Sequence, residues 1–397
     1  MTKSILFISC AFFIGHIAKA SDTITAPYSP GKQAAWQDTL VASTRVDTNK
    51  YVDSSAFADT ISKNYLATIR KDTIRLVAVG DIMTGTDFPS ARYLPPGNDC
   101  HNLFLPVKYY LTAADITFGN LEGVYASRYA KAKNCKDTSN CYVFRMPESH
   151  VACIKEAGFT LLSTANNHVG DFGEEGRQRT QEALAANGIN FAGFSTRPFV
   201  VFEQGGLKIG FLCLFSERGT LHMNDYAMVK QVVSMLNDSC DIVIVSVHAG
   251  AEGKDYEHVT REREMFLGMD RGNIYQFAHL AIDHGADVVL GHGPHVTRAM
   301  EVYKNRIIAY SLGNFCTYAR FNLSGPNGLA PILSMNLSPA GEFLSGQIIP
   351  VYQHGEGGPK IDEANRVIKR VRELSASDIP NNKLEISADG KLSIKTY

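Results

Sequence analysis

Imidazole, carboxylate and amide side chains occur in this sequence directly after short apolar runs. Residues 291–295 read GHGPH and follow the run ADVVL, so that His292 and His295 flank a Gly-Pro pair. Residues 164–173 read TANNHVGDFG and follow the run FTLLS. A turn alone explains two imidazoles across Gly-Pro poorly, and polar groups placed where a strand ends are typical of a functional site.

The same arrangement recurs after six apolar runs. Loops beyond the carboxyl ends of parallel strands share one edge of an α/β sheet, so groups far apart in sequence can converge there. We therefore predict one shared site from the polar residues at these six ends: Asp81; Asn120 and Glu122; Asn166, Asn167 and His168; His248 and Glu252; His292 and His295; and Asn314.

Imidazole and carboxylate ligands without a thiolate suit Mn, Fe or Zn in a reactive site better than a structural zinc site. We predict one or two divalent ions, because such ions generate hydroxide from water near neutral pH and stabilise charge on a phosphate or acyl oxygen. Each residue also has a plainer interpretation. Asp81 could terminate a turn, Glu122 could be a solvated acid, and His168 or His248 could be a hydrogen-bonded core histidine. Six such coincidences at six strand ends are improbable.

Other polar residues are less informative. His279 and His284 lie within a helical pattern and are expected to be structural, and Asp171 and Glu174 are expected to cap the helix that begins near them. The serine motif G-x-S-x-G and a P-loop are both absent from the sequence.

Apolar strand runs alternate with helical patterns from Thr73 onward. The runs lie at 73–79, 115–119, 159–164, 207–215, 241–247, 286–291 and 306–312, and helices are predicted at 148–158 and 273–285, each ending at a glycine. Later runs at 331–337 and 346–353 lack an intervening helix and predict an antiparallel addition, followed by a helix at 363–374 and a hairpin around Asp389-Gly390. This order predicts an α/β or layered α+β domain.

The N-terminus has the features of a secretory signal peptide. Lys3 precedes a mostly apolar run from Ile5 to Ile17, and Ala18-Lys19-Ala20 is a small-x-small cleavage pattern, so we expect export to the periplasm or cell envelope. A membrane anchor would need a longer apolar run, and a lipoprotein cut before Cys10 would leave a very short one. We predict residues 1–20 as the signal peptide, 21–70 as a leader or linker, and 71–397 as the domain. No other run approaches transmembrane length.

The chain has 397 residues, 45% of them hydrophobic, and a net charge of −1, which argues against a nucleic-acid partner. Seven cysteines remain after the signal peptide. Cys100, Cys135 and Cys141 lie in polar segments and could form disulfides, whereas we expect buried thiols at the cysteines of apolar segments, Cys153, Cys213, Cys240 and Cys316.

The ordered motifs GDIM, GNLE, ANNHVGDFG, HAGAE, GHGPH and YSLGNF resemble those of the CapA-type capsule-synthesis family, which is associated with poly-γ-glutamate capsules. The resemblance extends from about Arg75 to the C-terminus. It implies a relative of the calcineurin-like metallophosphatases, with two mixed β-sheets flanked by helices. By position it implies metal ligands at Asp81, Glu122, Asn167, His248, His292 and His295, with His168 as the acid or transition-state stabiliser. We add Asn166 as a catalytic residue, and Glu252, Asn120, Asn314 and Arg145 as residues behind the ligands or at the substrate.

The first motif departs from the metallophosphatase pattern, because Met83 stands where a metal-binding histidine is expected. One metal position is then weak or filled from elsewhere, for example by Glu252. Two functions follow from the resemblance. The first is an exported metal-dependent hydrolase, phosphoesterase-like or amidase-like, that acts on a capsule or envelope polymer or its precursor, with a capsule-synthesis membrane complex as a partner. The second is a non-catalytic envelope protein that binds anionic polymer.

Overall fold

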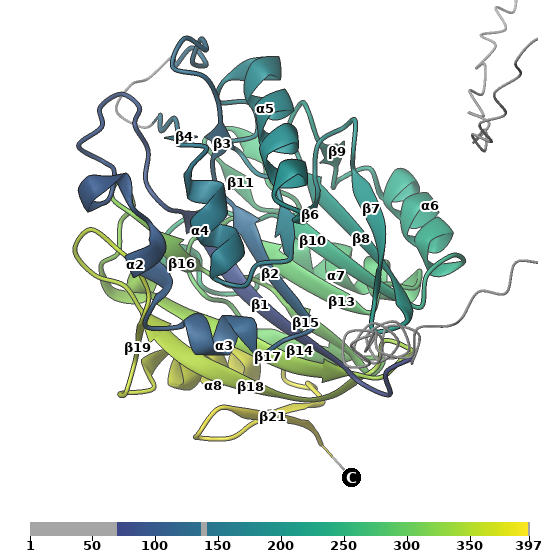
Figure 1. Cartoon of the computed structure of the whole chain (residues 1–397). Helices are drawn as coiled ribbons and strands as arrows, with labels where there is room; N and C mark the ends of the chain where they lie inside the picture. The colour runs from purple at the N-terminus through teal and green to yellow at the C-terminus, as the bar shows by residue number, and fades with distance from the viewer. Residues whose placement is uncertain (1–69, 136–140, 396–397) are drawn as a thin grey trace, which may run out of the picture. The chain divides into compact units, whose positions relative to one another are not determined.

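The computed structural model describes residues 70–135 and 141–395. The predicted signal peptide and all but the last residue of the predicted leader lie outside the described residues. Two large mixed sheets form the centre of the fold, and helices cover their outer faces (Figure 1). This arrangement confirms the predicted α/β class, a layered sandwich of two mixed β-sheets flanked by helices.

The first sheet runs in the order β20-β21-β18-β17-β1-β2-β5-β6, with β16 beside β1 and β19 beside β18. Strands β1, β2, β5 and β6 are parallel, and β17 and β18 add on in antiparallel fashion, as the sequence predicted. Its strands are β1 (Ile74–Met83), β2 (Ile116–Leu121), β5 (Leu161–Ser163), β6 (Asn190–Ala192), β16 (Asn314–Thr317), β17 (Leu329–Leu337), β18 (Phe343–Tyr352), β19 (Lys360–Ile361), β20 (Leu384–Ile386) and β21 (Lys391–Ile394).

The second sheet runs in the order β14-β15-β13-β10-β8-β7, with β9 beside β8. Strands β8, β10, β13 and β15 are parallel. Its strands are β7 (Phe199–Gln204), β8 (Leu207–Phe215), β9 (Leu221–His222), β10 (Ile242–His248), β13 (Val288–His292), β14 (Met300–Tyr303) and β15 (Arg306–Ala309). Two short pairs complete the described strands: β3 (Val124–Tyr125) with β4 (Arg145–Met146), and β11 (Met265–Phe266) with β12 (Met269–Asp270).

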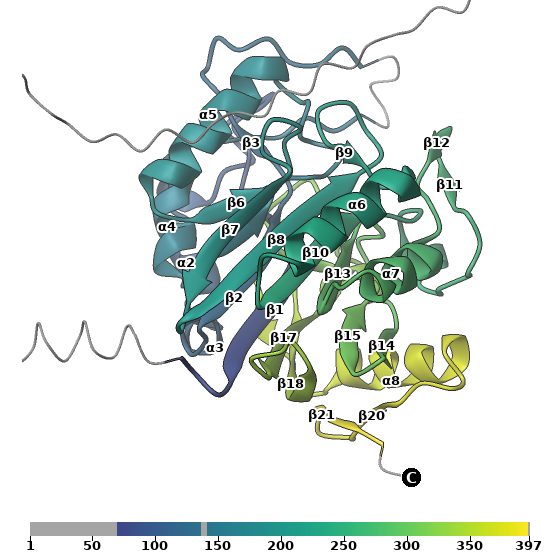
Figure 2. The same cartoon turned by 90° about the vertical axis from the view of Figure 1, so that its right-hand side faces the viewer.

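One apolar core joins the inner faces of the two sheets. Phe118 of β2 meets Phe211 of β8 edge to face, with ring centroids 5.7 Å apart. Apolar burial of this kind is the main favourable term in folding. Separate cores pack helices against the outer faces, and the views agree on which helix covers which sheet (Figures 1 and 2). Over the first sheet lie α2 (His101–Phe104), α3 (Lys108–Thr112), α4 (His150–Glu156) and α5 (Gly173–Ala186), over the second lie α6 (Tyr226–Asn237) and α7 (Ile274–Asp283), and α8 (Arg366–Asp378) contacts β14, β17 and β18.

The chain crosses from one sheet to the other near Gly313. The predicted strand 306–312 ends at Ala309 in the second sheet, and Asn314 begins β16 in the first. Gly313 has a φ of +64° at this crossing. Gly80 packs so tightly against it that a Cβ there would lie 1.8 Å from the carbonyl oxygen of Gly313. Both glycines are therefore required for β16 to lie beside β1.

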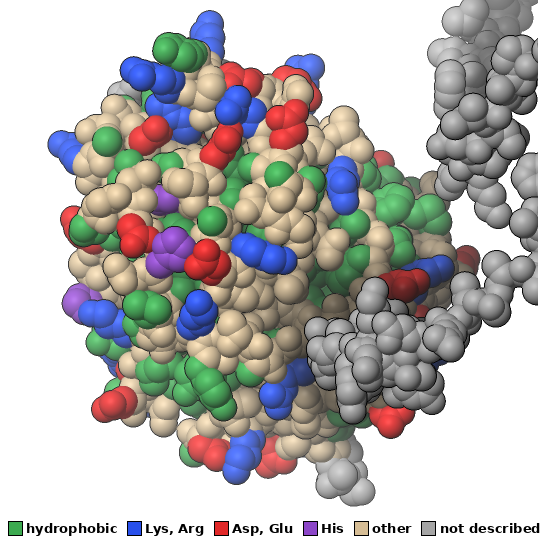
Figure 3. Space-filling model, viewed as in Figure 1, with side chains coloured by type: hydrophobic (Ala, Val, Ile, Leu, Met, Phe, Trp, Pro, Cys, Tyr) green, Lys and Arg blue, Asp and Glu red, His purple; other side chains and the backbone are tan. Residues whose placement is uncertain are grey.

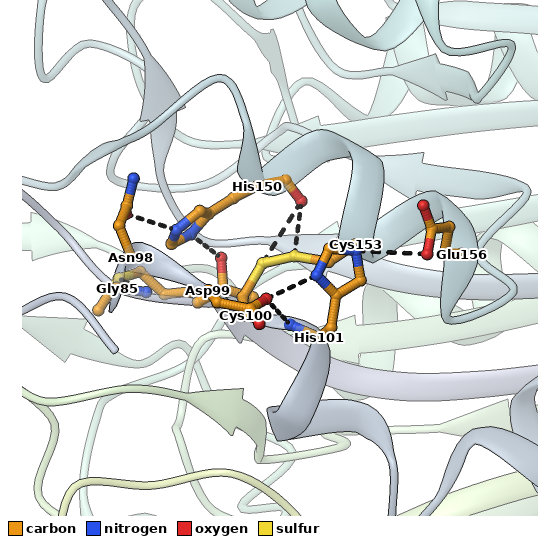
Figure 4. Close-up of a disulfide and its surroundings, with 10 residues drawn as sticks. Gly85, Asn98, Asp99, Cys100, His101, His150, Cys153 and Glu156 are labelled. Carbon is orange, nitrogen blue, oxygen red and sulfur yellow. Dashed lines mark hydrogen bonds and ion pairs between the residues drawn. A yellow bond between two sulfur atoms is a disulfide. The ribbon is translucent and has the colours of Figure 1, made fainter. Parts of the chain in front are cut away.

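The expected thiol at Cys153 is wrong. Cys153 of α4 forms a disulfide with Cys100, and the two Cα atoms lie 6.0 Å apart (Figure 4). A second disulfide joins Cys135 and Cys141, while Cys213 and Cys316 are buried thiols as expected and Cys240 is half-buried. Because Cys153 lies on the buried face of a short helix, its apolar surroundings concealed a partner that is distant in sequence.

The described surface carries charges of both signs. On the face shown in Figure 3, Lys and Arg side chains are interspersed with Asp and Glu. Attraction of a charged ligand to this face is therefore weak and screened within about 10 Å at ordinary salt. Within residues 70–135 and 141–395, no helix has the length and apolar character needed to cross a membrane.

Candidate metal centre

The predicted strand ends converge where the carboxyl edges of the two sheets meet. In the first sheet, Asp81 of β1 is in register with Asn120 of β2 on one side and with Asn314 of β16 on the other. In the second sheet, His248 of β10 is in register with His292 of β13. The parallel pairing that the sequence predicted thus places each sheet's polar residues side by side.

Asp81 links the two sheets. Its Oδ2 lies 2.9 Å from Nδ1 of His295, and its Oδ1 lies 3.4 Å from Nδ1 of His292. His295 reaches Asp81 because its backbone turns back after Gly293-Pro294 and adopts a φ of +57°. A left-handed conformation costs about 1 kcal/mol for a residue other than glycine, so the surrounding contacts hold it in place.

The pKa values of Asp81 and His295 are both strongly shifted. Burial by itself raises the pKa of Asp81, but the close contacts and the charge attraction of His292 and His295 outweigh burial and bring the pKa well below its usual value. Burial by itself lowers the pKa of His295, but the bond to Asp81 and the nearby carboxylates raise it to about 10. Asp81 is therefore a carboxylate, and without a metal His295 is its positively charged partner.

Glu122 lies completely buried between the two halves of the site. Asn120 donates from Nδ2 to Asp81 Oδ1 over 2.8 Å and also to Glu122 Oε2, so it joins the two acids. Within the described part of the chain, Oε1 of Glu122 has no hydrogen-bond partner, and it lies 3.9 Å from Nε2 of His168. Burial, reinforced by the charge of Asp81, raises the pKa of Glu122 well above its usual value. The attraction of His295 offsets these two effects only in part.

Asn166, Asn167 and His168 are consecutive residues, but each has a different role in the site. Asn166 donates to Asn120 Oδ1 over 3.1 Å and to Leu121 O over 2.7 Å, and it accepts from the backbone N–H of His168. Its amide therefore ties this loop to β2. Asn167 differs, because its Oδ1 is buried and has no partner in residues 70–135 and 141–395, and because it lines the adjoining pocket.

His168 is oriented by Asp171, whose expected role as a helix cap is wrong. Nδ1 of His168 lies 2.8 Å from Oδ2 of Asp171, and that oxygen also accepts from the backbone N–H of Phe144 over 2.7 Å. Phe172 occupies the cap position of α5, without a side-chain bond, and Glu174 is paired with Arg177. Burial lowers the pKa of His168, while the charge of Asp171 opposes the shift. The hydrogen bond of Nδ1 directs Nε2 toward Glu122 and toward Nδ2 of Asn167, which lies 3.3 Å away at the edge of the pocket.

His248 and His292 are the most unusual residues of the site. Both side chains are 1% exposed, and neither ring nitrogen of either residue has a hydrogen-bond partner among the described residues. Burial, together with the charge of Arg271, lowers the pKa of His248 well below its usual value. Buried polar groups in folded proteins are nearly always hydrogen-bonded, so each exception needs an explanation.

These unpartnered atoms are the test of whether the residues fit a metal ion. In the described part of the chain, no group of three His, Cys, Asp or Glu side chains is already arranged to hold one. The unpartnered donors are nevertheless those that a divalent ion uses: the ring nitrogens of His248 and His292, Oε1 of Glu122, and Oδ1 of Asn167 and Asn314. The donor set therefore fits a divalent cation, and it contains no thiolate.

Four residues were predicted to lie behind the ligands or at the substrate, and three of them do lie at the site. Besides Asn120, Glu252 lies 3.9 Å from Nε2 of His295, and Asn314 donates to the backbone oxygens of His295 and Asn327. Arg145 lies elsewhere. It pairs with Asp87 over 2.6 Å and is not among the residues that line the pocket.

A pocket of about 400 Å³ opens beside the cluster. Its walls include Asn167, His168, Glu252, His295 and Asn314. Phe144 covers His168 with ring centroids 4.3 Å apart, and Phe321 stacks on Phe144 at 5.2 Å. The pocket can thus admit a small ligand or a polymer segment next to the predicted ligands.

Sequence reasoning missed two residues here, Asp171 as the partner of His168 and Arg271 in the pocket wall. The spacing His-x-x-Asp could have indicated the first, since a turn brings such residues together. No local signal identifies Arg271, which lies 19 positions beyond its partner Glu252. Their contact exists only because the chain folds back through the β11–β12 pair.

Comparisons with known proteins show to which family the chain is similar. The family described as bacterial capsule synthesis protein PGA_cap matches residues 75–319. The capsule biosynthesis protein CapA of Bacillus anthracis is 28% identical over 345 residues, which cover 82% of this chain and 78% of that protein. The PGA biosynthesis protein CapA of Bacillus subtilis (strain 168) is 28% identical over 268 residues, which cover 62% of this chain and 64% of that protein. Among solved structures, the purple acid phosphatase PPD1 of yellow lupin is similar with 14% identity and a TM-score of 0.38, over 75% of this chain and 55% of that one.

Proposed function

The chain belongs to the bacterial capsule synthesis protein family, and from this premise we propose that it is an exported, metal-dependent hydrolase of capsule-polymer metabolism. Its substrate would be an envelope or capsule polymer, or a precursor of one, and a capsule-synthesis membrane complex would be its partner. Relatives named for capsule and PGA biosynthesis support the polymer as the substrate class.

One observation carries this proposal: the unpartnered ring nitrogens of the buried residues His248 and His292. Burying a polar group without a partner costs about 1–3 kcal/mol. Two such residues in register, beside a carboxylate with a free oxygen, form an unfavourable arrangement in the absence of a ligand. A divalent cation would stabilise all of these groups together.

In this proposal the metal, as one or two ions of Mn, Fe or Zn, is held by Asp81, Glu122, Asn167, His248, His292 and His295. A bound divalent ion would activate water near neutral pH and offset negative charge on a phosphoryl or acyl oxygen. Asn120 keeps the two carboxylates in place through its Nδ2 hydrogen bonds. Asn166 holds the loop that carries Asn167 and His168 against β2.

In the proposed hydrolysis, His168 is the residue that transfers a proton. Asp171 accepts a hydrogen bond from Nδ1, so Nε2 faces the pocket, where it can accept a proton or, once protonated, donate it to a leaving group. Burial lowers the pKa of His168 and favours the neutral ring, while Asp171 stabilises the protonated ring. Phe144 packs against the imidazole and limits access of bulk water to it.

Export is supported by the disulfides as well as by the N-terminal sequence. The described chain contains two disulfides, Cys100–Cys153 and Cys135–Cys141. Disulfides persist in secreted and periplasmic proteins and are rare in the cytosol. They favour a periplasmic or cell-envelope location.

Met83 favours the second candidate function, a non-catalytic protein that binds anionic polymer. It occupies the position of an expected metal-binding histidine, but it is buried in an apolar core, and its sulfur accepts from the backbone N–H of Gly85. The cluster therefore has one ligand fewer than the metallophosphatase pattern.

Metal content and hydrolysis, measured together, distinguish the two functions. We expect the mature protein, expressed with added Mn, Fe and Zn, to retain about one or two metal equivalents by mass spectrometry. It should also hydrolyse a phosphoester or a γ-glutamyl amide. His292→Ala should lose both properties, whereas the control His150→Ala should retain its metal. A wild-type protein that binds no metal would exclude the hydrolase and leave the polymer-binding function.

A further inference from the structure

Arg271 lies in the wall of the pocket and has no role in the mechanism above. It directly follows β12, and the β11–β12 pair projects at the side of the second sheet (Figure 2). Its side chain is 4% exposed, and yet it borders the pocket together with His295 and Glu252. Arg271 is thus a buried cation that faces the same space as the candidate metal ligands.

The guanidinium of Arg271 is held in place but not saturated. Nη2 donates to Oε1 of Glu252 over 2.6 Å. The group also lies 5.2 Å from the ring centroid of Phe215 and 5.6 Å from that of Phe266. Nε and Nη1 are buried and have no hydrogen-bond partner among the described residues. Leaving donors of a buried charge unpaired is costly, so a purely structural role for Arg271 is unfavourable.

Arg298 shows how this fold satisfies a structural guanidinium. It is completely buried, and its two terminal nitrogens each donate to Glu264 over 2.7 Å. Its Nε donates to the backbone oxygen of Tyr256 over 2.7 Å. Every nitrogen of Arg298 therefore has a protein partner, whereas two of the three nitrogens of Arg271 do not.

The charges around the pocket favour an anion as the missing partner. Lys133 and Arg320 also line it, and Arg320 packs over Tyr93 and Tyr142 without a carboxylate partner in the described chain. Glu217 and Glu252 also line the pocket, and Lys133 is paired with Asp171, so these acids offset part of the positive charge. Arg320 and the two unpartnered nitrogens of Arg271 remain available to an anion. A carboxylate or phosphate can accept from an arginine in geometries that a neutral group cannot match.

We propose that Arg271 is the anion-binding residue of the pocket, which binds a carboxylate or phosphate group of the ligand while Glu252 and the two phenylalanines hold the guanidinium in place. Anion binding by Arg271 deepens the proposed function. It would select substrates that carry an anionic group next to the bond that is hydrolysed at the metal centre. It rests on that function only for the hydrolytic step. The binding itself needs no metal.

Calorimetric titration of the mature chain tests this role after chelation, which removes any binding of anions by metal. The probes are inorganic phosphate, tetra-γ-glutamate and the same peptide with every carboxylate amidated. We expect wild type to bind one of the anions and Arg271→Met to bind it at least about tenfold more weakly. Arg271→Lys should restore part of the affinity. The control Arg263→Met removes an exposed arginine that pairs with Asp270, and it should change affinity by less than about twofold.

The amidated peptide should bind equally weakly to all variants. The anion that loses affinity in Arg271→Met identifies the ligand chemistry as carboxylate or phosphate. Equal anion affinity in wild type and in a folded Arg271→Met, or no anion binding by wild type, would overturn the proposal. If Arg271→Met fails to fold, Arg271→Lys and Arg271→Gln decide by the same comparison. A chain that binds anions through Arg271 but holds no metal would contradict the hydrolase alone.

Discussion

Histidines are buried in two regions of the molecule, beside the Cys100–Cys153 disulfide and at the candidate metal centre, and the two regions differ in how the imidazole rings are hydrogen-bonded. Beside the Cys100–Cys153 disulfide, His150 is 1% exposed, and both ring nitrogens are bonded, over 2.9 Å each, to Thr84 Oγ1 and Asn98 Oδ1 (Figure 4). At the cluster, His248 and His292 are equally buried, and none of their ring nitrogens has a hydrogen-bond partner among the described residues. Burial is the same, but hydrogen bonding is not.

The difference separates a structural histidine from one that requires a ligand. His150 lies on α4, where its two hydrogen bonds tie the helix to the segments at Thr84 and Asn98. Both of its ring nitrogens are therefore satisfied by groups of the protein, and the ring needs no ligand. His248 and His292 lie at strand ends beside Glu122, whose Oε1 is also unpartnered. Arg298 and Arg271 show the same contrast for arginine. Unsatisfied buried donors and acceptors are therefore the most informative feature of this structure.

Chelation should show the contrast most strongly. Removing metal from wild type is expected to lower the free energy of unfolding by about 4 kcal/mol when free metal had exceeded its dissociation constant by about a thousandfold. The double substitution His248→Leu and His292→Leu should abolish this effect. In the absence of metal, the double variant should be no less stable than wild type, because it removes buried unpartnered imidazoles. Urea unfolding with and without chelator measures both, and equal sensitivity of the two proteins to chelator would contradict the predicted site.

Removing the disulfide beside His150 should have the next largest effect. Cys100 and Cys153 are 53 positions apart, so their double replacement by Ser is expected to cost about 3–4 kcal/mol through the entropy of the unfolded chain. The control is the double replacement of Cys135 and Cys141, which are 6 positions apart and should cost about 2 kcal/mol. Metal content should stay unchanged in the Cys100 and Cys153 variant. Loss of metal there would show that the two regions are not independent.

His150→Ala should cost about 2–3 kcal/mol in the free energy of unfolding, because it creates a cavity and leaves Thr84 and Asn98 unpaired. Its metal content should equal that of wild type. Chemical denaturation and mass spectrometry measure these two quantities. A His150→Ala protein of wild-type stability would remove the basis for calling this histidine structural.

The stability contributed by His150 should depend on pH. Burial lowers its pKa from 6.5 to about 4, so the unfolded chain binds the proton more readily than the folded chain does. The contribution is therefore fully present above pH 6.5 and decreases as the pH falls toward 4, by about 3 kcal/mol. His150→Gln should flatten the stability profile over this range in chelated protein. Parallel profiles for the two proteins would contradict the shifted pKa.

The smallest effect is expected at Asp171, which supports the cluster without being a ligand. Asp171→Asn should lower kcat by about tenfold, because His168 loses the carboxylate that orients its ring, while metal content is retained. Glu174→Gln is the matched control, since Glu174 is an exposed acid near the same helix start and pairs only with Arg177. Steady-state kinetics on whichever substrate is hydrolysed would test this. An equal loss of activity in both variants would argue against a specific role for Asp171.

Local sequence patterns predicted most of the elements. Apolar runs identified β1, β2, β8, β10 and β13 because the strands of a covered parallel sheet are apolar on both faces. Gly158 and Gly285 follow the ends of α4 and α7 with φ of +111° and +106°, as the helix stop signal predicted. The pairing of β20 with β21 around Asp389-Gly390 agrees with the expected hairpin. Each of these features depends on neighbours in the chain.

The amino-acid sequence alone identified the polar residues at the strand ends. A polar residue that follows an apolar run lies at the carboxyl end of a strand, and parallel pairing brings these ends to one edge of the sheet. Which of these residues have hydrogen-bond partners became visible in the folded structure alone. The apolar run at 306–312 did not reveal that the chain leaves one sheet after Ala309 and enters the other at Asn314. Cys153 with Cys100, Asp171 with His168, and Glu252 with Arg271 were likewise hidden, since a side-chain contact depends on distance in space. Residue type shows what a group can bind, and the packed fold determines whether that binding is already satisfied within the chain.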